Sequence, residues 1–482
     1  REWFIMFNKR NFIIAVVIIS LLLIGGASYV IFIPDPVNSA NEYLKAIEDK
    51  NYEKAYSLLT EESKKELSIE KIKNRYEGFY QKATVEEKNF KNLIVKRDDF
   101  FSASADYKLN LESSDFGEKN YKFDMLLKRK GLINWKIEWD YNLIFPGITK
   151  ESEFVRKSIL PERGNILDRN KIPLAVKGEV VEIGIQSAKV KNKEKLITEL
   201  KKLIDVDRNE IIRSIERYPD NPKWFSPLKT LTWNDYKEVE EKLRPISGVF
   251  FRKKESRVYP YKKSSAHLTG YIGEITKEKI DSETQIDYKS GELIGKSGLE
   301  KSYEKKLRGK NGYILYLQDE NNNKEEIMRK DSVAGENLVT TINIELQNKV
   351  WKSLDNKKGA VVITDPESGE ILAMVSSPSY NPNQFVLGIS QREWSKIQKD
   401  NNSPMLNRAL QGLYPPGSTF KIVTAAAALT NEVVKTDTVF NDKGKITVEG
   451  NKIRNYQNEI FGEHSFTEAL THSINTTLEP FF

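Results

Sequence analysis

The sequence predicts a multidomain α+β protein that carries an N-terminal transmembrane helix, and three observations lead to that fold class. The chain has 482 residues, enough for about three domains of ~150 residues each. Near the N-terminus lies a run of 22 residues without a charge, Phe12–Ile33. After it, segments of helical and strand-like spacing alternate, and their character changes near residues 150 and 338. With 39% hydrophobic and 30% charged residues, the rest of the chain is expected to be folded and globular rather than disordered.

The uncharged run predicts a membrane anchor. As a helix, residues 12–33 would span roughly 33 Å, enough for a hydrocarbon core of ~30 Å. Lys9 and Arg10 precede the run, so the positive-inside rule places residues 1–11 in the cytoplasm as a short tail and residues 34 onward outside. A cleaved signal peptide is the alternative, because Gly25-Gly26-Ala27-Ser28 could serve as a cleavage site. The apolar run continues past that point, which favours a retained, single-pass anchor in the cell membrane.

Residues 35–147 predict a small α+β domain. Leu44 and Ile47, followed by Tyr52 and Ala55, have helical spacing. The alternating segments from about residue 92 to residue 145 are typical of strands. The segment contains no catalytic constellation, and a folded spacer is the interpretation.

Residues 150–335 predict a second unit. It opens on short apolar strands separated by tight turns at Arg163-Gly164 and Asp168-Arg169-Asn170, and lysine-rich helices follow. From Leu338 the pattern changes again into a strand, a helix and a hairpin whose turn is Asp365–Gly369. Residues 338–482 are therefore predicted to form an α/β domain.

Composition excludes several kinds of chemistry. Cysteine is absent and only three histidines occur, which leaves almost nothing for a thiolate site, a zinc site or a histidine-based triad. The net charge of +7 is spread along the chain without an arginine-rich helix, so nucleic acid is a poor candidate partner. No metal or cofactor is implied, and nucleophilic chemistry would need a base other than histidine.

Ser418 and Lys421 are the strongest candidate catalytic pair. The Ser-x-x-Lys pattern occurs four times, but only here does it follow a Pro-Pro-Gly turn and precede a nearly uncharged helix. That helix is expected to be buried on all sides. Burial disfavours the ammonium form of Lys421, and the neutral amine could then reach Ser418 one turn away and take its proton. The alternative is a serine that caps an ordinary helix beside a lysine reaching solvent.

Ser473 and Asn475 form a second candidate element. A serine near a serine–lysine pair can relay a proton to a leaving group, and an asparagine amide can hold a substrate amide. Ser-x-Asn is a weak signal by itself, since Ser379-Tyr380-Asn381 also matches it. Its order and spacing relative to Ser418 give it weight.

These motifs together resemble the class B penicillin-binding proteins, whose motif set is Ser-x-x-Lys, Ser-x-Asn and Lys-Thr-Gly. The resemblance extends to residues 163–175 and 295–309, which look like the family's extended pedestal, or dimerisation, domain, and to residues 359–383, which look like the first hairpin of its β-lactamase-like transpeptidase domain. Residues 35–147 resemble the cone-like, nuclear-transport-factor-2-like domain of the methicillin-resistance subgroup.

The resemblance implies a peptidoglycan D,D-transpeptidase. Ser418 would attack the penultimate D-Ala carbonyl of a stem peptide with Lys421 as base, Ser473 would relay the proton to the departing D-Ala, and Asn475 would hold the network and the substrate amide. The implied partners are stem peptides, β-lactams that acylate the same serine, and a glycosyltransferase or a division or elongation complex.

The Lys-Thr-Gly box does not follow Asn475 in this sequence. The resemblance therefore implies a chain that stops within the transpeptidase domain. The alternatives are a catalytically inactive fragment or scaffold, a β-lactam sensor, and a D,D-carboxypeptidase or serine β-lactamase.

Overall fold

The computed structural model describes residues 18, 35–131, 134–282 and 288–481. The chain divides into two compact units, one comprising Arg1–Ile344 with Asn381–Ser390, the other comprising Glu345–Tyr380 with Gln391–Phe482. The predicted anchor, residues 12–33, lies outside the described residues except for Ile18. Within the described ranges, no helix is long and apolar enough to cross a membrane.

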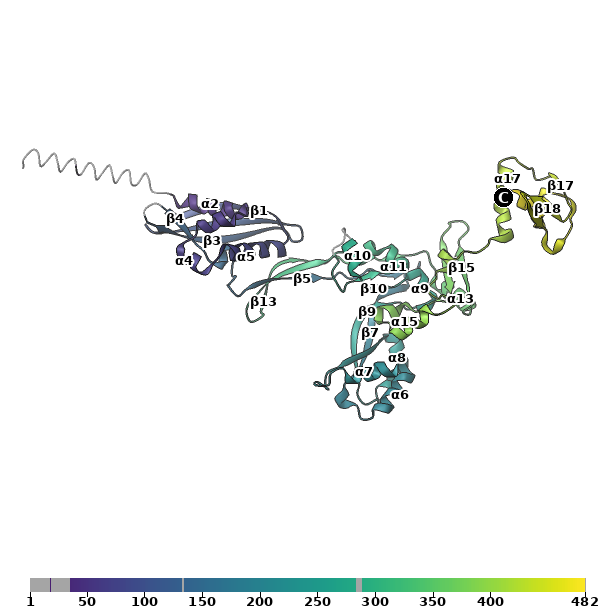
Figure 1. The fold of residues 1–482 in the computed structure, drawn as a ribbon, viewed down its shortest axis with the longest axis horizontal. Coiled ribbons are helices and arrows are strands. Elements are labelled where there is room, and N and C mark those ends of the chain that lie inside the picture. The colour runs from purple at the N-terminus through teal and green to yellow at the C-terminus, as the bar shows by residue number, and fades with distance from the viewer. Residues whose placement is uncertain (1–17, 19–34, 132–133, 283–287, 482) are drawn as a thin grey trace, which may run out of the picture. The chain divides into compact units, whose positions relative to one another are not determined.

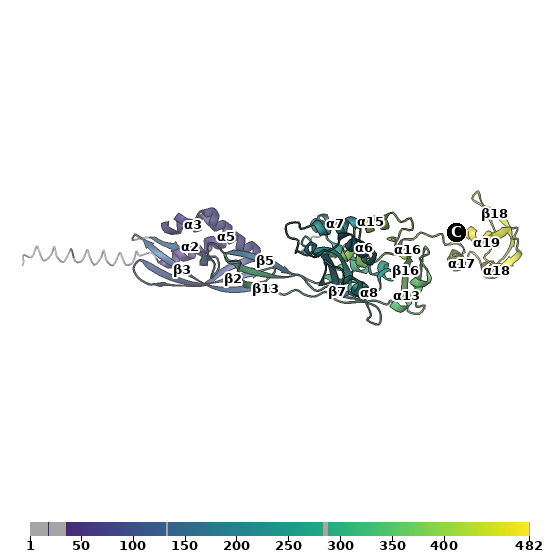
Figure 2. The ribbon, with the colours of Figure 1, turned by 90° about the horizontal axis from the view of Figure 1, so that it is seen from below.

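The first part of unit 1 is a four-stranded antiparallel sheet with four helices packed on one side (Figures 1 and 2). Its sheet order is β1-β2-β3-β4. The helices are α2 (Pro36–Glu48), α3 (Tyr52–Ser57), α4 (Glu61–Glu66) and α5 (Ile69–Lys82), and the strands are β1 (Val85–Arg97), β2 (Ser102–Ser113), β3 (Gly117–Lys130) and β4 (Asn134–Glu138). A short 3₁₀ helix, η1 (Tyr141–Leu143), follows.

The two-residue alternation of the sequence produces this layer. Along β2, buried residues such as Tyr107, Leu109 and Leu111 alternate with more exposed ones, so one face of the sheet is covered by the helices and the other meets solvent. Polar caps begin the helices: the side chains of Asp35 and Thr60 accept hydrogen bonds from backbone N–H groups in the first turns of α2 and α4. The predicted α+β organisation of this region is confirmed.

A second sheet of unit 1 joins strands that lie far apart in the sequence. Strand β12 (Gly312–Gln318) pairs antiparallel with β5 (Glu153–Ile159) on one edge and with β13 (Lys324–Lys330) on the other. Buried side chains of these strands, Phe154, Leu315 and Met328 among them, belong to the same hydrophobic core as the first domain.

The remainder of unit 1 is a mixed five-stranded sheet with its own helical lobe. The sheet order is β14-β6-β7-β8, and β9 pairs with β7. Its strands are β6 (Ile166–Leu167), β7 (Pro173–Ile185), β8 (Ser226–Thr232), β9 (Val249–Val258) and β14 (Leu338–Val339). The helices packed on it are α6 (Lys193–Ile204), α7 (Arg208–Glu216) and α8 (Trp233–Leu243), with η2 (Ser187–Lys189) between β7 and α6.

The segment after β9 contains short elements. These are η3 (Lys262–Ser264), α9 (Ala266–Thr269), β10 (Ile272–Glu274), α10 (Lys277–Ser282), β11 (Leu293–Gly295), α11 (Gly298–Ser302) and α12 (Glu304–Arg308). Helix α14 (Pro382–Leu387), which comes later in the sequence, also belongs to unit 1. Gly270 fits its place here because its φ is +73° and an added Cβ would lie 1.8 Å from the carbonyl oxygen of Ser297. The turn before β10 therefore packs directly on the start of α11.

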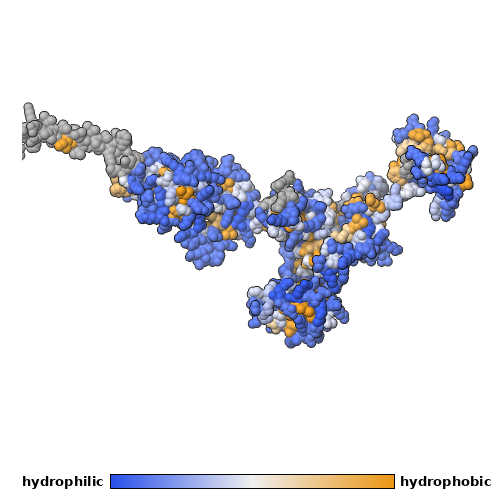
Figure 3. All heavy atoms as spheres, in the orientation of Figure 1, coloured by the Kyte–Doolittle hydropathy of each residue, from blue (hydrophilic) through white to orange (hydrophobic). Residues whose placement is uncertain are grey.

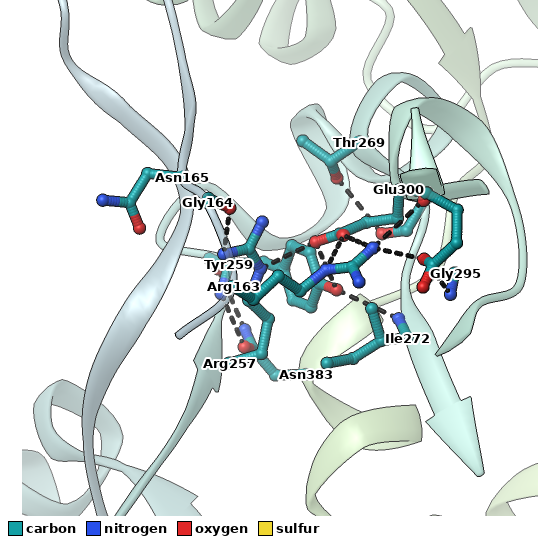
Figure 4. A network of polar contacts seen from close by, with 12 residues as sticks. Arg163, Gly164, Asn165, Arg257, Tyr259, Thr269, Ile272, Gly295, Glu300 and Asn383 are labelled. Carbon is teal, nitrogen blue, oxygen red and sulfur yellow. Dashed lines mark hydrogen bonds and ion pairs between the residues drawn. The ribbon is translucent and has the colours of Figure 1, made fainter. Parts of the chain in front are cut away.

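A buried ionic cluster holds together three segments of unit 1: the chain just before β6, strand β9 and helix α11 (Figure 4). Glu300 of α11 is completely buried. Its Oε1 accepts hydrogen bonds from Arg257 Nε (2.7 Å) and the Tyr259 hydroxyl (3.1 Å), and its Oε2 accepts from Arg163 Nε (2.8 Å). Arg163 also donates to Glu304 at 2.7 Å. Burial alone would lower the pKa of Arg163, but the two carboxylates outweigh it and raise that pKa above its usual range.

Unit 2 begins with a helix and the predicted hairpin. Helix α13 (Ile344–Ser353) continues from the end of unit 1, and β15 (Gly359–Thr364) pairs antiparallel with β16 (Ile371–Ser377) around the expected turn. Gln347 fixes the helix to the hairpin, because its amide donates to the carbonyl of Met374 and accepts from that residue's N–H, both at 2.8 Å. Helices α15 (Gln391–Gln398) and α16 (Arg408–Gln411) follow.

The last part of unit 2 is a lobe around a small apolar core. Its elements are η4 (Gly417–Phe420), α17 (Lys421–Thr430), β17 (Val439–Asp442), β18 (Lys445–Val448), β19 (Asn451–Arg454), η5 (Tyr456–Asn458), β20 (Gly462–Ser465), α18 (Phe466–Thr471), α19 (Asn475–Leu478) and η6 (Glu479–Phe481). The core includes Ala425, Ala428, Phe466, Ala469 and Leu478.

Candidate active site

Ser418 lies on the surface of this lobe, in the 3₁₀ turn that leads into α17. Gly417, with a φ of +56° and open space where a Cβ would stand, makes the turn before it. The carbonyl of Ser418 accepts a hydrogen bond from the Lys421 N–H, so the turn joins the helix without a break. The serine is exposed, so its hydroxyl is open to solvent.

Lys421 is buried at the first position of α17, where only 3% of the residue is exposed. Its Nζ donates to the carbonyl oxygen of Ser473 (2.7 Å), to the Ser473 hydroxyl (3.1 Å) and to Oδ1 of Asn475. Burial lowers the pKa of Lys421 below its usual range, and the carboxylate of Glu479 opposes this shift in part. Burial therefore makes the ammonium form of Lys421 less favourable than it is in solvent, although three acceptors surround its Nζ.

The structure joins the side chains of three of the four predicted residues by hydrogen bonds and leaves the Ser418 hydroxyl outside that group. The side chains of Lys421, Ser473 and Asn475 form one hydrogen-bonded group, whereas within the described residues no hydrogen bond joins the Lys421 amine to the Ser418 hydroxyl. The expected hydrogen bond between the Lys421 amine and the Ser418 hydroxyl is thus not formed. The physical reason is that three acceptors from residues 473–475 satisfy the amine of Lys421.

Ser473 reaches Lys421 through an unusual backbone conformation. Its φ is +56°, in the left-handed region that non-glycine residues rarely adopt. Helix α18 ends just before it, and the Ile474 N–H returns to the carbonyl of Ala469 at 2.9 Å, which closes the helix end. This turn directs both the carbonyl and the hydroxyl of Ser473 at Lys421, and such strain is typical of functional positions.

Asn475 connects the lysine to a strand. Its Oδ1 accepts from Lys421, and its Nδ2 donates to the carbonyl of Arg454 at the end of β19 (2.9 Å). An amide nitrogen carries two hydrogens, so one donor remains for a further acceptor such as a substrate carbonyl.

The sequence predicts α17 to be buried on all sides, and this prediction is wrong. Lys421, Thr424, Ala425 and Ala428 face the lobe, where α17 packs on α18, α19 and η6. Ile422 and Val423, in contrast, are 67% and 55% exposed. Figure 3 shows apolar side chains gathered on the visible face of this lobe. The lobe is too small to surround a helix, so its packing covers only the face that carries Lys421.

A polar network behind the site was not predicted from the sequence. The carboxylate of Asp442 accepts from the Thr476 hydroxyl (2.7 Å), the Asn455 amide (2.7 Å) and the N–H groups of Phe461 (2.9 Å) and Gly444 (2.8 Å). Burial raises the pKa of Asp442, but these hydrogen bonds outweigh it and hold the pKa below its usual range. Because Thr476 follows Asn475, this network fixes the start of α19. An Asp-Lys-Gly turn is too common a sequence to have indicated it.

Replacing Asp442 with asparagine is expected to destabilise the lobe by about 1–3 kcal/mol, since an amide cannot accept all four hydrogen bonds. Because the pKa is lowered in the folded chain, the carboxylate stabilises fully above its ordinary value of 3.8, and this contribution is lost as the pH falls through the lower folded pKa. Faster amide hydrogen exchange in α17 and α19 at neutral pH is the expected result. Exchange in Asp442→Asn that matches the exposed control Asp437→Asn would contradict the role of the network.

Within the described ranges, no group of histidine, cysteine, aspartate and glutamate side chains is placed to hold a metal ion. The candidate site consists of one amine, two hydroxyls and one amide, which suits acyl transfer through a serine.

Comparison with known proteins relates all three regions to one family. Residues 35–152 match the NTF2-like N-terminal transpeptidase domain, residues 158–340 match the penicillin-binding protein dimerisation domain, and residues 359–480 match the penicillin-binding protein transpeptidase domain. The expected multidomain organisation of NTF2-like, dimerisation and transpeptidase domains is confirmed.

Individual relatives agree with these matches. Penicillin-binding protein 3 of Bacillus subtilis is 34% identical over 417 residues, which is 85% of this chain and 62% of the relative. Peptidoglycan D,D-transpeptidase MrdA of Escherichia coli K12 is 33% identical over 330 residues, 66% of this chain and 52% of the relative. The chain thus spans about half to three-fifths of the length of these relatives.

One solved structure agrees as well. It is the complex between a penicillin-binding protein, PBP2, and MreC from Helicobacter pylori, with a TM-score of 0.50 and 28% identity over 67% of this chain and 61% of that one.

Proposed function

Because the chain belongs to the penicillin-binding proteins, we propose that it acts as a peptidoglycan D,D-transpeptidase, which crosslinks stem peptides through a serine acyl-enzyme and binds penicillin covalently. The observation that carries the proposal is the buried Lys421 amine, held by Ser473 and Asn475 one helical turn from an exposed serine. Ser418 is the nucleophile, Lys421 the general base, Ser473 the proton relay and Asn475 the residue that positions the other two and binds substrate amide.

The proposed reaction has two steps. In the first, Ser418 Oγ attacks the carbonyl carbon of the penultimate D-Ala of a donor stem, and its proton passes to the neutral Lys421 amine. The bond to the terminal D-Ala breaks, and the leaving nitrogen receives a proton through the Ser473 hydroxyl. In the second step, the amine of another stem attacks the ester, which releases Ser418 and forms the crosslink.

A penicillin would use the first step alone. Its strained amide replaces the donor peptide bond, and because the leaving nitrogen stays tethered, the acyl-enzyme is slow to turn over. This makes a stable adduct at Ser418 the direct test of the proposal.

The test is the intact mass of the 482-residue chain, kept in detergent, after incubation with a penicillin. The expected result is a gain of one drug molecule that disappears in Ser418→Ala. A folded chain without an adduct would overturn the proposal in favour of a scaffold or inactive fragment. In a second assay the chain receives a donor stem and an acceptor amine: a transpeptidase forms a crosslinked product, whereas a carboxypeptidase releases the hydrolysed stem. Rapid loss of the penicillin adduct would indicate a β-lactamase.

The proposal includes a location and partners. Residues 12–33 would span the cell membrane once, with residues 1–11 in the cytoplasm and the rest outside, where peptidoglycan lies. The similarity to a PBP2 solved in complex with MreC supports binding to a partner protein, and the proposal extends this to a division or elongation complex or a glycosyltransferase.

A further inference from the structure

Two phenylalanines stand exposed at one end of the first domain. Phe100 and Phe101, in the turn between β1 and β2, are 45% and 61% exposed, and their rings meet edge to face with centroids 4.9 Å apart. Asp99 fixes the turn, because its carboxylate accepts from the N–H groups of Phe101 (2.6 Å) and Ser102 (2.7 Å). The two rings are therefore held outward by a hydrogen-bonded turn.

The end of β3 adjoins this turn. The Arg129 N–H donates to the carbonyl of Phe101 at 2.8 Å, and the Arg129 guanidinium lies 4.5 Å from the centre of the Phe100 ring. Residues 96–101, 128–131 and 134–136 thus adjoin one another, and we name their exposed side chains the basic tip.

The basic tip has an excess of positive charge. Five basic residues there are exposed or part-exposed (Lys96, Arg97, Lys128, Lys130 and Lys136), against two acidic ones, Asp98 and Asp99, while Arg129 is buried beneath them. Lys128 stands directly opposite Lys136 in the β3–β4 register, an arrangement in which like charges repel. Glu138 pairs with Lys128, and Glu61 pairs with Lys130. Burial and the nearby charges of Lys64 and Lys130 nevertheless lower the pKa of Lys136. An anion at this surface would relieve the repulsion.

The basic tip lies at the end of the domain where α2 begins (Figures 1 and 2). Helices α2 and α3 run in opposite directions, since Lys54 of α3 pairs with Glu42 of α2 at 2.8 Å. Helix α3 then ends at Ser57, whose carbonyl accepts from Lys136 Nζ at 2.7 Å. The first residue of α2, Pro36, comes three positions after the predicted membrane span.

We propose that the basic tip rests on an anionic bilayer, with Phe100 and Phe101 in the headgroup region and the basic side chains on lipid phosphates. The inference rests on the membrane span of the proposed function, which would hold this end of the domain within a few residues of the bilayer. Exposed phenylalanine rings can enter the headgroup boundary of a bilayer, and basic side chains beside them favour anionic lipid, so the two features fit one partner. Contact at the basic tip would restrict how the domain tilts above the membrane.

The absence of cysteine allows a clean test with a single label. The full chain carrying Phe101→Cys, labelled with an environment-sensitive fluorophore, is placed in vesicles that contain phosphatidylglycerol and a headgroup-nitroxide lipid. Ser114→Cys, exposed in the β2–β3 turn at the other end of the sheet, is the matched control. Strong quenching at position 101 with little at 114 is expected, and Lys96→Gln or Lys128→Gln should each shift the contact equilibrium roughly fivefold toward the free state.

Equal quenching at positions 101 and 114, or equal quenching at 101 in vesicles of phosphatidylcholine alone, would overturn the proposal. A label at 101 already shielded without lipid would overturn it too, by indicating a second copy of the chain as the partner. Resistance of the chain to alkaline extraction from the same vesicles tests the membrane span separately, so failure of the span is distinguishable from failure of the basic tip.

Discussion

Replacing Lys421 with methionine is expected to slow the acylation of Ser418 by a penicillin by about 10²–10⁴-fold, the usual contribution of a positioned general base. Methionine preserves length and suits a buried position, but it cannot take a proton. The measurement is the rate of adduct formation followed by intact mass. Because burial lowers the pKa of Lys421, the wild-type rate should rise with pH and level off below the ordinary lysine value of 10.5.

Two variants separate the base from other roles of this side chain. Lys421→Arg keeps a charged donor for Ser473 and Asn475 but stays protonated, so it should be nearly as slow as the methionine variant. Lys435→Met changes an exposed lysine and should acylate at the wild-type rate. An arginine variant that retains the wild-type rate would show that Lys421 acts by positioning Ser473 and Asn475 and not by accepting the proton.

The structure brings Lys421, Ser473 and Asn475 together, but the contacts of Lys421 differ from the one that the sequence predicted. Helical spacing suggested a direct Lys421–Ser418 contact, because local pairs are all that spacing can reveal. The partners of Lys421 in the structure lie 52 and 54 positions away. Ser473 and Asn475 reach Lys421 because the backbone of Ser473 is left-handed. The residues that usually indicate such a conformation are glycine and asparagine, and a serine at this position gives no such signal.

The strands and helices of unit 1 followed more directly from the pattern, because a two-residue alternation determines which face of a sheet is buried. What the pattern missed is the buried charge. Segments such as Gly298–Ser302 contain charged residues that single-segment reasoning assigns to the surface. Glu300 is buried only because Arg163 and Arg257 arrive from elsewhere in the chain, so no local feature could have indicated it.

Glu300 is accordingly the residue of unit 1 whose removal should cost the most. Replacing it with alanine would leave the Arg257 side chain, which is 3% exposed, and the Arg163 guanidinium without their shared carboxylate. Removing one partner of a buried ion pair destabilises by about 3–5 kcal/mol, because the remaining charge stays buried. The hydroxyl of Tyr259 would lose its acceptor as well. The measurement is urea unfolding followed by tryptophan fluorescence, to which Trp224 and Trp233 contribute from the same region.

Glu255→Ala is the matched control. Glu255 pairs with Lys177 at 2.7 Å, but this pair is exposed: the Glu255 side chain is 69% exposed and that of Lys177 is 48% exposed. Its removal should change stability by less than about 1 kcal/mol. Glu300→Gln keeps the shape and one acceptor oxygen, so it should fall between the two. Equal stability of Glu300→Ala and Glu255→Ala would mean that water reaches the arginines when the carboxylate is lost. The three segments around Glu300 would then be held by their backbone packing, such as that of Gly270 on Ser297, and not by charge.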